Sequence, residues 1–411
     1  MTDTTLVELS RNARHPPRLD SIARGLVLSR LAALRNGRLR LRDGDEVFEF
    51  GESGGAPDAT LTVLDPAFYA DLAFGGSVGA GESYMLGHFE ADDLTAAMRV
   101  MLSNRDALDS LEGGFAAAAA PLRRIAHWMH RNTRGGSRRN IAAHYDIGND
   151  FFRLFLDETM MYSCALFERP EMTLAEASGA KLDAICARLE LRPGDHVLEI
   201  GTGWGGFAIH AASRHGCRVT TTTISPSQYE LARERVRAAG LDDRVTILLE
   251  DYRDLRGTYD RIVSIEMIEA IGHQYYEEFF RRCAQRLAPG GRMLLQSITI
   301  ADRRYASARD DVDFIKRYIF PGCCIPSLTA LAQAMTAASD LRIIHLDDIG
   351  PHYATTLARW RENLFANLDR VRALGYPDTF IRMWEFYLCY CEAGFAARAL
   401  SDVQILLSRE G

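Results

Sequence analysis

A chain of 411 residues is longer than one typical domain, so its length predicts two or three compact units with a large buried core. Hydrophobic residues make up 47% and charged residues 25% of the chain, which excludes a wholly disordered or fibrous protein. The formal net charge of −7 argues against nucleic acid as a partner, and no apolar run is long enough for a membrane span or a signal core. We therefore expect a cytoplasmic protein.

The cysteines indicate the compartment in which the protein works, and the basic residues indicate which partners it can bind. The eight cysteines lack the spacing and the partner histidines of a zinc site, so we expect reduced thiols and no metal. Basic residues gather over residues 24–42 and over residues 113–145, and the second stretch contains no acid. The second stretch is either a solvated linker or a patch for anionic lipid headgroups, to which each arginine adds about 1 kcal/mol. Its central residues are Arg134, Arg138 and Arg139.

The first predicted element is an amphipathic helix over residues 21–35. Three short alternating stretches, RLRLR, VFEF and TLTVL, follow it and are separated by turn signals, which predicts a small antiparallel sheet. Residues 93–131 then have a helical pattern. The expected apolar positions of the first helix are Ile22, Leu26, Leu31 and Leu34.

From about residue 176 onward, apolar strand patterns alternate with helical ones. The predicted strands are HVLEI, RVTTTTI, RVTILLE, RIVSIE and RMLLQSI, with helices such as SQYELARERVRAAG between them. This alternation is typical of a parallel sheet wrapped by helices. The stretch over residues 355–409 is rich in aromatic residues at helical spacing, so we expect helices there.

A glycine-rich turn follows the first of these strands, in the segment VLEIGTGWGG over residues 197–206. Glycines let the backbone approach a ligand closely between a strand and a helix. An acid two residues before the first glycine suits a cofactor with a cationic amino-acid end better than the pyrophosphate of a dinucleotide. We therefore predict that S-adenosylmethionine is bound by Glu199, Gly201, Gly203 and Gly205.

Two further turns lie at the same predicted sheet edge, where ligands bind in parallel sheets. The second strand ends at Thr223 and Ile224, with Gln228 nearby, and we expect all three to contact the cofactor. After the third strand, Asp251 can accept a hydrogen bond from the adenine amino group, and Tyr252 can cover the ring.

Eight segments together resemble the successive motifs of the cyclopropane-fatty-acid synthase family, which includes the mycolic acid cyclopropane synthases. They are HYDIGNDFF, MYSCALFE, the glycine motif, TISPSQ, EDYRDL, SIEMIEAIGHQYYEEFF, FIKRYIFPGCCIPS and HYATTL. The upstream segment VGAGESYMLGHFEADDL resembles the lipid-contacting domain of the bacterial phospholipid enzymes. The resemblance implies an α+β lipid-binding domain over residues 1–130, a basic linker over 131–143, and a Rossmann-like α/β class I methyltransferase domain over 144–411.

The resemblance also implies the reaction, which is transfer of the sulfonium methyl group to a cis alkene in a phospholipid acyl chain. An alkene has no proton to lose before it attacks, so the enzyme mainly supplies alignment and a dry pocket. Attack leaves a carbocation, which aromatic faces stabilise. The aromatic candidates are Tyr145, Phe151, Tyr162, Tyr318, Phe320 and Tyr353.

In these synthases a bound bicarbonate removes the proton. The resemblance implies Cys164, Glu269, the backbone of Ile298 and Tyr353 as its ligands, and Gln296 stands at the position of a histidine. Glutamine can donate a hydrogen bond to an anion but cannot relay a proton. This departure leaves two products open, a cyclopropane, which we favour, and a methylene branch. In the MYSCALFE motif, the residues implied to bind the cofactor are Tyr162 and Ser163.

Two other functions stay open from the sequence. One is methyl transfer to a nitrogen or oxygen of a small molecule, since the resemblance extends to plant N-methyltransferases, but the lipid-contacting segment argues against it. The other is a lipid-binding module without catalysis, which the intact glycine motif argues against. The resemblance finally implies an unsaturated phospholipid as substrate, peripheral contact with the inner face of the membrane, and a homodimer.

Overall fold

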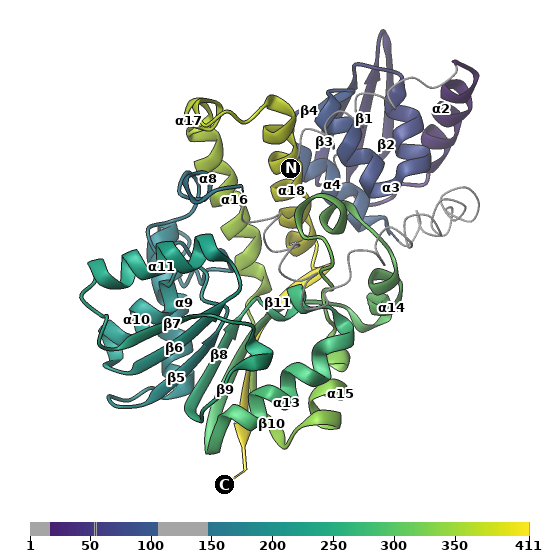
Figure 1. The fold of residues 1–411 in the computed structure, drawn as a ribbon. Helices are drawn as coiled ribbons and strands as arrows, with labels where there is room; N and C mark the ends of the chain where they lie inside the picture. The colour runs from purple at the N-terminus through teal and green to yellow at the C-terminus, as the bar shows by residue number, and fades with distance from the viewer. Residues whose placement is uncertain (1–16, 53, 55, 106–146, 411) are drawn as a thin grey trace. The chain divides into compact units, whose positions relative to one another are not determined.

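The computed structural model describes residues 17–52, 54, 56–105 and 147–410, which belong to two compact units (Figure 1). The first unit comprises residues 1–129, 310–321 and 367–399, and the second comprises residues 130–309, 322–366 and 400–411. Each unit therefore combines segments that are far apart in the sequence. The predicted basic linker, including Arg134, Arg138 and Arg139, lies outside the described residues, and the domain boundaries expected above stay a prediction.

The first unit contains a mixed four-stranded sheet in the order β2-β1-β3-β4. Leu39 and Leu41 of β1 are fully buried, as the alternation predicts. β1 pairs antiparallel with β2 but parallel with β3, so the prediction of a purely antiparallel sheet was wrong. The reason is that β3 lies on the far side of β1 from β2 and runs in the same direction as β1. The strands are β1 (Arg38–Asp43), β2 (Glu46–Gly51), β3 (Asp58–Val63) and β4 (Phe89–Ala91).

Helix α2 (Pro17–Leu31) confirms the first predicted helix. Of the expected apolar positions, Leu31 and Leu34 are buried, whereas Leu26 is half-buried and Ile22 is 61% exposed. In the first turns, Ala23 and Val27 are buried instead. They lie beside Ile22 and Leu26 on the helix, so the periodicity alone does not choose between the two stripes there.

Helix α18 (Asp378–Ala396) packs in the first unit although it lies near the end of the sequence. The Tyr84 hydroxyl donates to Glu385 at 2.7 Å, and the Arg382 guanidinium lies over the Tyr84 ring at 4.1 Å. Long-range polar contacts of this kind complete the unit. Its other elements are α3 (Ala67–Leu86), α4 (Leu94–Ser103), the π-helix η3 (Ile315–Ile319) and α17 (Leu368–Ala373).

The second unit is built on a seven-stranded sheet in the order β10-β11-β9-β8-β5-β6-β7. The five predicted strands are present and parallel, which confirms the doubly wound α/β fold. The expectation of helices up to residue 409 was wrong at its end, where β11 pairs antiparallel with β9. β11 is buried on both faces, so its apolar run lacks the alternation that marks a strand.

Two hydrophobic clusters cover opposite faces of this sheet (Figure 1). Leu198 of β5 faces the cluster that includes α13 and α15, and the preceding Val197 faces the cluster that includes α9 and α10. The carboxyl ends of the parallel strands are thereby held at one edge. The elements are α8 (Asn149–Phe152), α9 (Leu174–Leu189), β5 (His196–Ile200), α10 (Gly206–His215), β6 (Arg218–Thr223), α11 (Pro226–Ala238), β7 (Val245–Leu249), η1 (Tyr252–Asp254), β8 (Tyr259–Ile265), α12 (Ile268–Ile271), η2 (His273–Tyr275), α13 (Tyr276–Arg286), β9 (Leu287–Ile300), α14 (Asp302–Asp310), α15 (Leu328–Ala338), β10 (Leu341–Asp348), α16 (Gly350–Ala366) and β11 (Leu400–Arg409).

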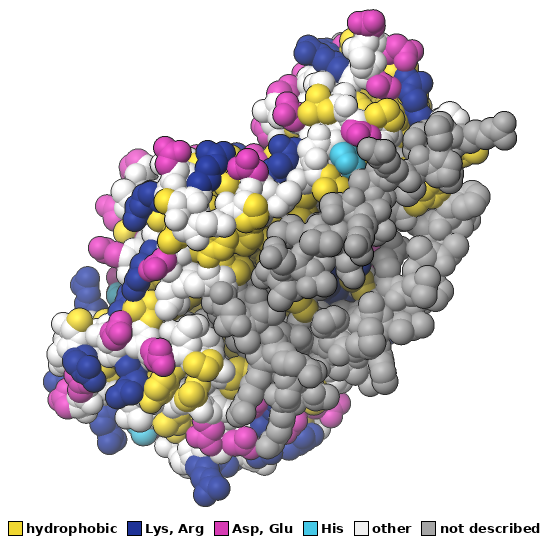
Figure 2. Space-filling view, turned by 45° about the horizontal axis from the view of Figure 1, so that its top comes forward, with side chains coloured by type: hydrophobic (Ala, Val, Ile, Leu, Met, Phe, Trp, Pro, Cys, Tyr) yellow, Lys and Arg dark blue, Asp and Glu magenta, His cyan; other side chains and the backbone are white. Residues whose placement is uncertain are grey.

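The described surface carries charges of both signs, side by side (Figure 2). In the basic stretch over residues 24–42, Arg24 pairs with Asp43 at 2.9 Å, and Arg38 and Arg40 both pair with Glu49. Acids that follow this stretch in the sequence therefore neutralise part of its charge. Among the described helices, none is both long enough and apolar enough to cross a bilayer.

Candidate active site

The glycine-rich turn after β5 requires glycine at three positions. Gly201, Gly203 and Gly205 have φ angles of 104°, 51° and 85°, a region that other residues rarely adopt. At Gly206, where α10 begins, a Cβ atom would lie 2.7 Å from the Met161 sulfur. The sequence motif thus reflects a tight turn whose backbone stays open to a ligand.

Glu199 lies within β5, two residues before this turn, and only 3% of its surface is exposed. Burial raises the pKa of its carboxyl to about 8, although a hydrogen bond with Thr221 and the charge of Lys181 oppose the shift. Its Oε2 atom has no hydrogen-bond partner among the described residues. A buried acceptor without a donor fits a ligand that brings hydroxyl or cationic groups, as S-adenosylmethionine does.

The next two strand ends carry the other predicted cofactor residues. The Thr223 hydroxyl donates to Gln228 Oε1 at 2.8 Å, and Ile224 is half-buried. The Asp251 carboxylate accepts two hydrogen bonds from the Arg253 guanidinium, at 2.6 and 2.8 Å. An adenine amino group would therefore share this acceptor with arginine.

Tyr252 lies beside these strand ends and is buried. Its ring packs edge-on against Phe279 at 5.7 Å, and its hydroxyl has no partner in the described part of the chain. The ring is therefore held by core packing on one side. Its contact with adenine stays a prediction.

Glu266 forms the centre of a second polar cluster, in the turn between β8 and α12. Its Oε1 atom accepts hydrogen bonds from the Cys164 backbone N–H and the Gln296 side-chain amide, both at 2.8 Å. Its Oε2 atom accepts from the Tyr353 hydroxyl at 2.6 Å. Glu266 was not predicted from the sequence, although an acid directly after a buried strand, within the motif SIEMIEAIGHQYYEEFF, was a usable signal.

Glu269 lies three residues further on, in α12, and contacts the last residues of β9. Its Oε1 atom accepts from the Ile298 backbone N–H at 2.5 Å and from the Ser297 hydroxyl at 2.9 Å. Its Oε2 atom is buried without a partner in the described residues. Burial, and then the neighbouring Glu266 charge, raise the pKa of Glu269 to about 8.

The bicarbonate implied by the resemblance does not fit this arrangement. Its expected donors from Cys164, Gln296 and Tyr353 already donate to Glu266. The expected backbone donor, the Ile298 N–H, already donates to Glu269. A carboxylate is a planar anion with two acceptor oxygens, as bicarbonate is, and it satisfies the same donors from within the chain. The residues expected to hold the ion are thus brought together, but around a side chain.

A second layer of polar groups supports Gln296. Its amide nitrogen also donates to Asp402 Oδ2 at 2.9 Å, and its amide oxygen accepts from Gln404 at 3.0 Å. Burial, followed by the charges of Glu266 and Glu269, holds the pKa of Asp402 well above its usual value. The Cys164 thiol points elsewhere, toward the carbonyl oxygens of Ala165 and Ile349, and burial raises its pKa as well. Only the backbone of this cysteine faces Glu266.

Tyr353, whose hydroxyl donates to Glu266, belongs to a cluster of aromatic rings. Trp360 packs against Tyr353 at 6.1 Å and against Tyr162 at 5.1 Å between ring centroids. Phe152 continues the cluster to Tyr162 and to Phe151. Three of the predicted aromatic residues therefore share one cluster, in which Trp360 is the central ring.

The other predicted aromatic residues lie elsewhere in the chain. Tyr145 is outside the described residues. Tyr318 and Phe320 belong to the first unit, where the Tyr318 hydroxyl contacts Glu82 and the Phe320 ring packs against Tyr387 at 6.3 Å. Their role in stabilising the carbocation stays a prediction.

Replacing Glu269 by glutamine is expected to stabilise the free protein at neutral pH. The folded-state pKa of Glu269 lies above its unfolded value, so the wild type loses stability as the pH rises from about 4.5 toward 8. An amide can still accept from Ile298 and does not ionise, which is worth on the order of 3 kcal/mol at pH 7. Denaturant unfolding at pH 7 should show the gain. If the two proteins differ equally at pH 4.5, this explanation fails.

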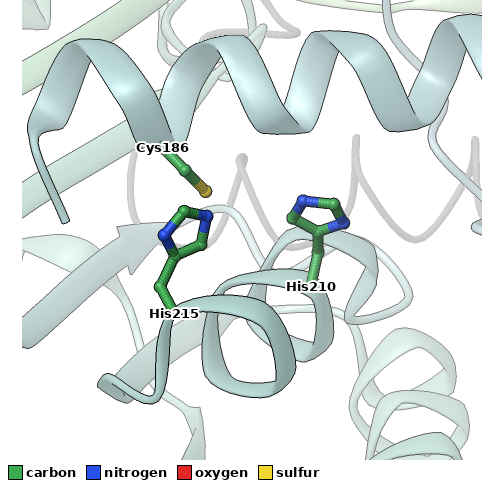
Figure 3. A group of neighbouring side chains, drawn as sticks. All are labelled: Cys186, His210 and His215. Carbon is green, nitrogen blue, oxygen red and sulfur yellow. The ribbon is translucent and has the colours of Figure 1, made fainter. Parts of the chain in front are cut away.

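A separate group of possible metal ligands lies on α9 and α10, where the sequence predicts no metal (Figure 3). Cys186, His210 and His215 place their ligand atoms within 4.8 Å of one another. However, His210 Nε2 already lies 2.7 Å from the Asp183 carboxylate. Burial also raises the pKa of the Cys186 thiol, which disfavours the thiolate that a metal requires. We assign no metal to this group.

Comparisons with known proteins place the chain in a family. The family model described as mycolic acid cyclopropane synthetase matches residues 132–405. The chain is 39% identical over 411 residues to tuberculostearic acid methyltransferase UfaA1 of Mycobacterium tuberculosis, covering 96% of this chain and 95% of that protein. It is 38% identical over 362 residues to the cyclopropane-fatty-acyl-phospholipid synthase of Escherichia coli, covering 87% of this chain and 89% of that protein.

The solved structures agree with the sequence comparisons. Mycolic acid cyclopropane synthase CmaA1, in complex with SAH and CTAB, superposes with a TM-score of 0.61 at 32% identity, covering 66% of this chain and 98% of that one. SAH is the product that S-adenosylmethionine leaves after methyl transfer, which agrees with the ligand inferred at the glycine turn. The chain belongs to the mycolic acid cyclopropane synthetase family and is an S-adenosylmethionine-dependent methyltransferase of the cyclopropane synthase type.

Proposed function

We propose that this enzyme methylates the cis double bond of an unsaturated phospholipid acyl chain and forms a cyclopropane with loss of one proton. The observation that carries the proposal is the buried Glu266 carboxylate, held by three donors and joined through Tyr353 to the Trp360 cluster. Alkene methylation needs both parts, an aromatic wall that tolerates a carbocation and an acceptor for a carbon-bound proton. Methyl transfer to a nitrogen atom forms no carbocation, so it needs no such aromatic wall.

The residues then have separate roles. S-adenosylmethionine, when bound, supplies the electrophilic methyl group. Glu199 and the glycine turn bind it, and the rings of Tyr162 and Trp360 exclude water from the acyl chain. When a C–H bond of the added carbon breaks, its electron pair closes the ring and the proton passes to a Glu266 oxygen. This assignment replaces the bicarbonate implied by the resemblance with a side chain of the protein.

A second product is favoured by one comparison. The relative UfaA1, which matches almost the whole chain, is named a tuberculostearic acid methyltransferase. A hydride shift before proton loss would give a methylene branch, the isomer of the cyclopropane, from the same residues. The positions of Glu266 and Gln296 serve both outcomes, because the proton leaves the added carbon in each.

Incubation of the enzyme with S-adenosylmethionine and vesicles of dioleoyl phosphatidylglycerol tests the proposal. Proton NMR of the released fatty acids separates the isomers, since cyclopropane protons lie upfield of all other acyl signals and exocyclic methylene protons lie in the vinyl region. Vesicles of the saturated dipalmitoyl lipid are the control. Equal methylation of both lipids, or methylation of the headgroup, would overturn the proposal.

Contact with the inner face of the membrane, and a homodimer, complete the proposal. Changing Arg134, Arg138 and Arg139 to glutamine is expected to lower activity at limiting concentrations of anionic vesicles by about 100-fold and to flatten its salt dependence, because each arginine adds about 1 kcal/mol near such a surface and salt screens it. Initial rates between low and high salt provide the measurement.

The matched control removes three positive charges from another part of the surface. Arg218, Arg237 and Arg244 are exposed and lie on the methyltransferase unit. Their change to glutamine should leave the salt curve close to that of the wild type. If both triple variants respond alike, net charge rather than a lipid-binding patch governs the activity.

A further inference from the structure

Lysine is rare in this chain, and one of its lysines lies under the active site. Only two of the 48 lysine and arginine residues are lysines. Lys181, on α9, is fully buried, with 0% exposure. Its position on the same helix face as Leu182 and Ile185 carries it into the interior, where its ammonium donates to the Ser163 hydroxyl at 2.7 Å.

A buried ammonium needs anionic neighbours, and several acids of the site supply them. The charges that act on Lys181 come from Glu266 after β8, Asp402 on β11 and Asp157 before α9, and the Cys164 thiol also contributes. Glu266 and Asp402 are themselves joined, because the Gln296 amide donates to both. The charge of Glu266 also acts on Glu269 of α12, and the Tyr353 hydroxyl of α16 donates to Glu266.

The electrostatic influences run in both directions. Burial lowers the pKa of Lys181, and the charge of Glu266 opposes this shift more than any other group does. Burial raises the pKa of Glu266, and Lys181 is among the groups that lower it. Lys181 also lowers the pKa of Glu199 at the cofactor turn. One cation thus acts both on Glu199, at the cofactor turn, and on Glu266, the proposed proton acceptor.

We propose that Lys181 is a positioning residue for proton removal: its buried ammonium donates to Ser163, the residue before the Cys164 N–H that holds Glu266, and supplies positive charge to a site that also contains Glu269 and Asp402. The inference rests on the proposed function of Glu266 and adds the group that sets its charge. Lysine suits this place better than arginine, because a compact ammonium on a thin stem fits among apolar side chains. Ser163, which accepts from Lys181, is also one of the residues expected to contact the cofactor.

The pH dependence of kcat for Lys181→Met tests the proposal. Loss of the cation raises the pKa of Glu266, and the ionised base is lost as the pH falls through that pKa. The acid limb of the profile should therefore move to higher pH by about one unit, so that kcat falls about tenfold at the acid end and recovers toward the wild type in alkali. Asp402→Asn removes an acid from the same cluster and should not move the limb upward.

The same lysine can be observed without turnover. Protein labelled with [ε-¹³C]lysine has only two labelled side chains, so the Lys181 signal is readable, and Glu266→Gln should move its chemical shift. This readout also separates the failure of this proposal from failure of the proposed function. A moved signal in a protein that does not methylate alkenes would retain the electrostatic coupling of Lys181 and Glu266, whereas an unmoved signal would overturn it. A Lys181→Met profile that falls in parallel at every pH would also overturn it, because that result marks a purely structural lysine.

Discussion

Glu266→Gln is expected to lower kcat by about 10³-fold while changing the affinity for S-adenosylmethionine less than threefold. The amide keeps the size of the carboxylate but cannot accept a proton, and loss of a general base costs about 10² to 10⁴ in rate. The three donors around Glu266 come from segments other than the glycine turn, so the cofactor site should persist. Single-turnover rates and calorimetric titration with SAH measure the two quantities. A variant that retains more than a tenth of the wild-type rate would exclude Glu266 as the base.

Glu266→Gly is a sharper variant because it opens the space that the carboxylate fills. The φ angle of Glu266 is 49°, in a region that favours glycine, so the backbone should accept the change. The donors of Cys164, Gln296 and Tyr353 would then face an empty anion site, and added bicarbonate or formate should restore part of the activity. The wild type should not respond to bicarbonate. If the wild type loses activity in buffer free of carbon dioxide, then bicarbonate, and not Glu266, accepts the proton.

The second large effect is expected at Glu199. Glu199→Gln should weaken S-adenosylmethionine binding about 10- to 100-fold, because a hydrogen bond to a charged group contributes about 1.5–3 kcal/mol and the ligand is cationic. Its Oε2 atom is the unpartnered acceptor beside the glycine turn, so the ligand would supply the missing donor. Calorimetry gives the affinity directly, with product formation at saturating cofactor as a second readout.

Glu230→Gln is the matched control for this prediction. Glu230 lies on α11 with its side chain exposed, so its replacement makes the same change of charge away from the strand ends. Affinity should stay at the wild-type value. An equal loss in both variants would mean that long-range charge, and not contact with Glu199, accounts for the binding.

The fold was largely predictable where one local pattern sets one outcome. The parallel strands of the second unit each form a short apolar run between helices, and the glycine turn has the φ angles its motif requires. The sequence was least informative where packing decides. It did not show that Ala23, and not Ile22, is buried in the first turns of α2, and it did not show that β3 pairs parallel with β1. β11 was missed because a strand buried on both faces has no alternation.

The site was predictable as a set of positions but not as a set of contacts. Cys164, Gln296 and Tyr353 do converge, as the resemblance implied, yet they converge on Glu266. Glu266 was not predicted because the resemblance implies Glu269, three residues later, as the acid of this segment. Lys181 was not predicted because lysine side chains are seldom fully buried. Only the fold shows that this one is buried and which acids lie near it.

The most direct measurement of the central claim follows the hydrogens of the transferred methyl group. With S-adenosylmethionine labelled with three deuterium atoms in that methyl group, and dioleoyl phosphatidylglycerol as acceptor, we expect a lipid that retains two of the three and water that gains the third. Both alkene products require this loss, because Glu266 takes a proton from the added carbon in each. A lipid or small molecule that keeps all three deuterium atoms would contradict methylation of a double bond followed by proton transfer to this carboxylate.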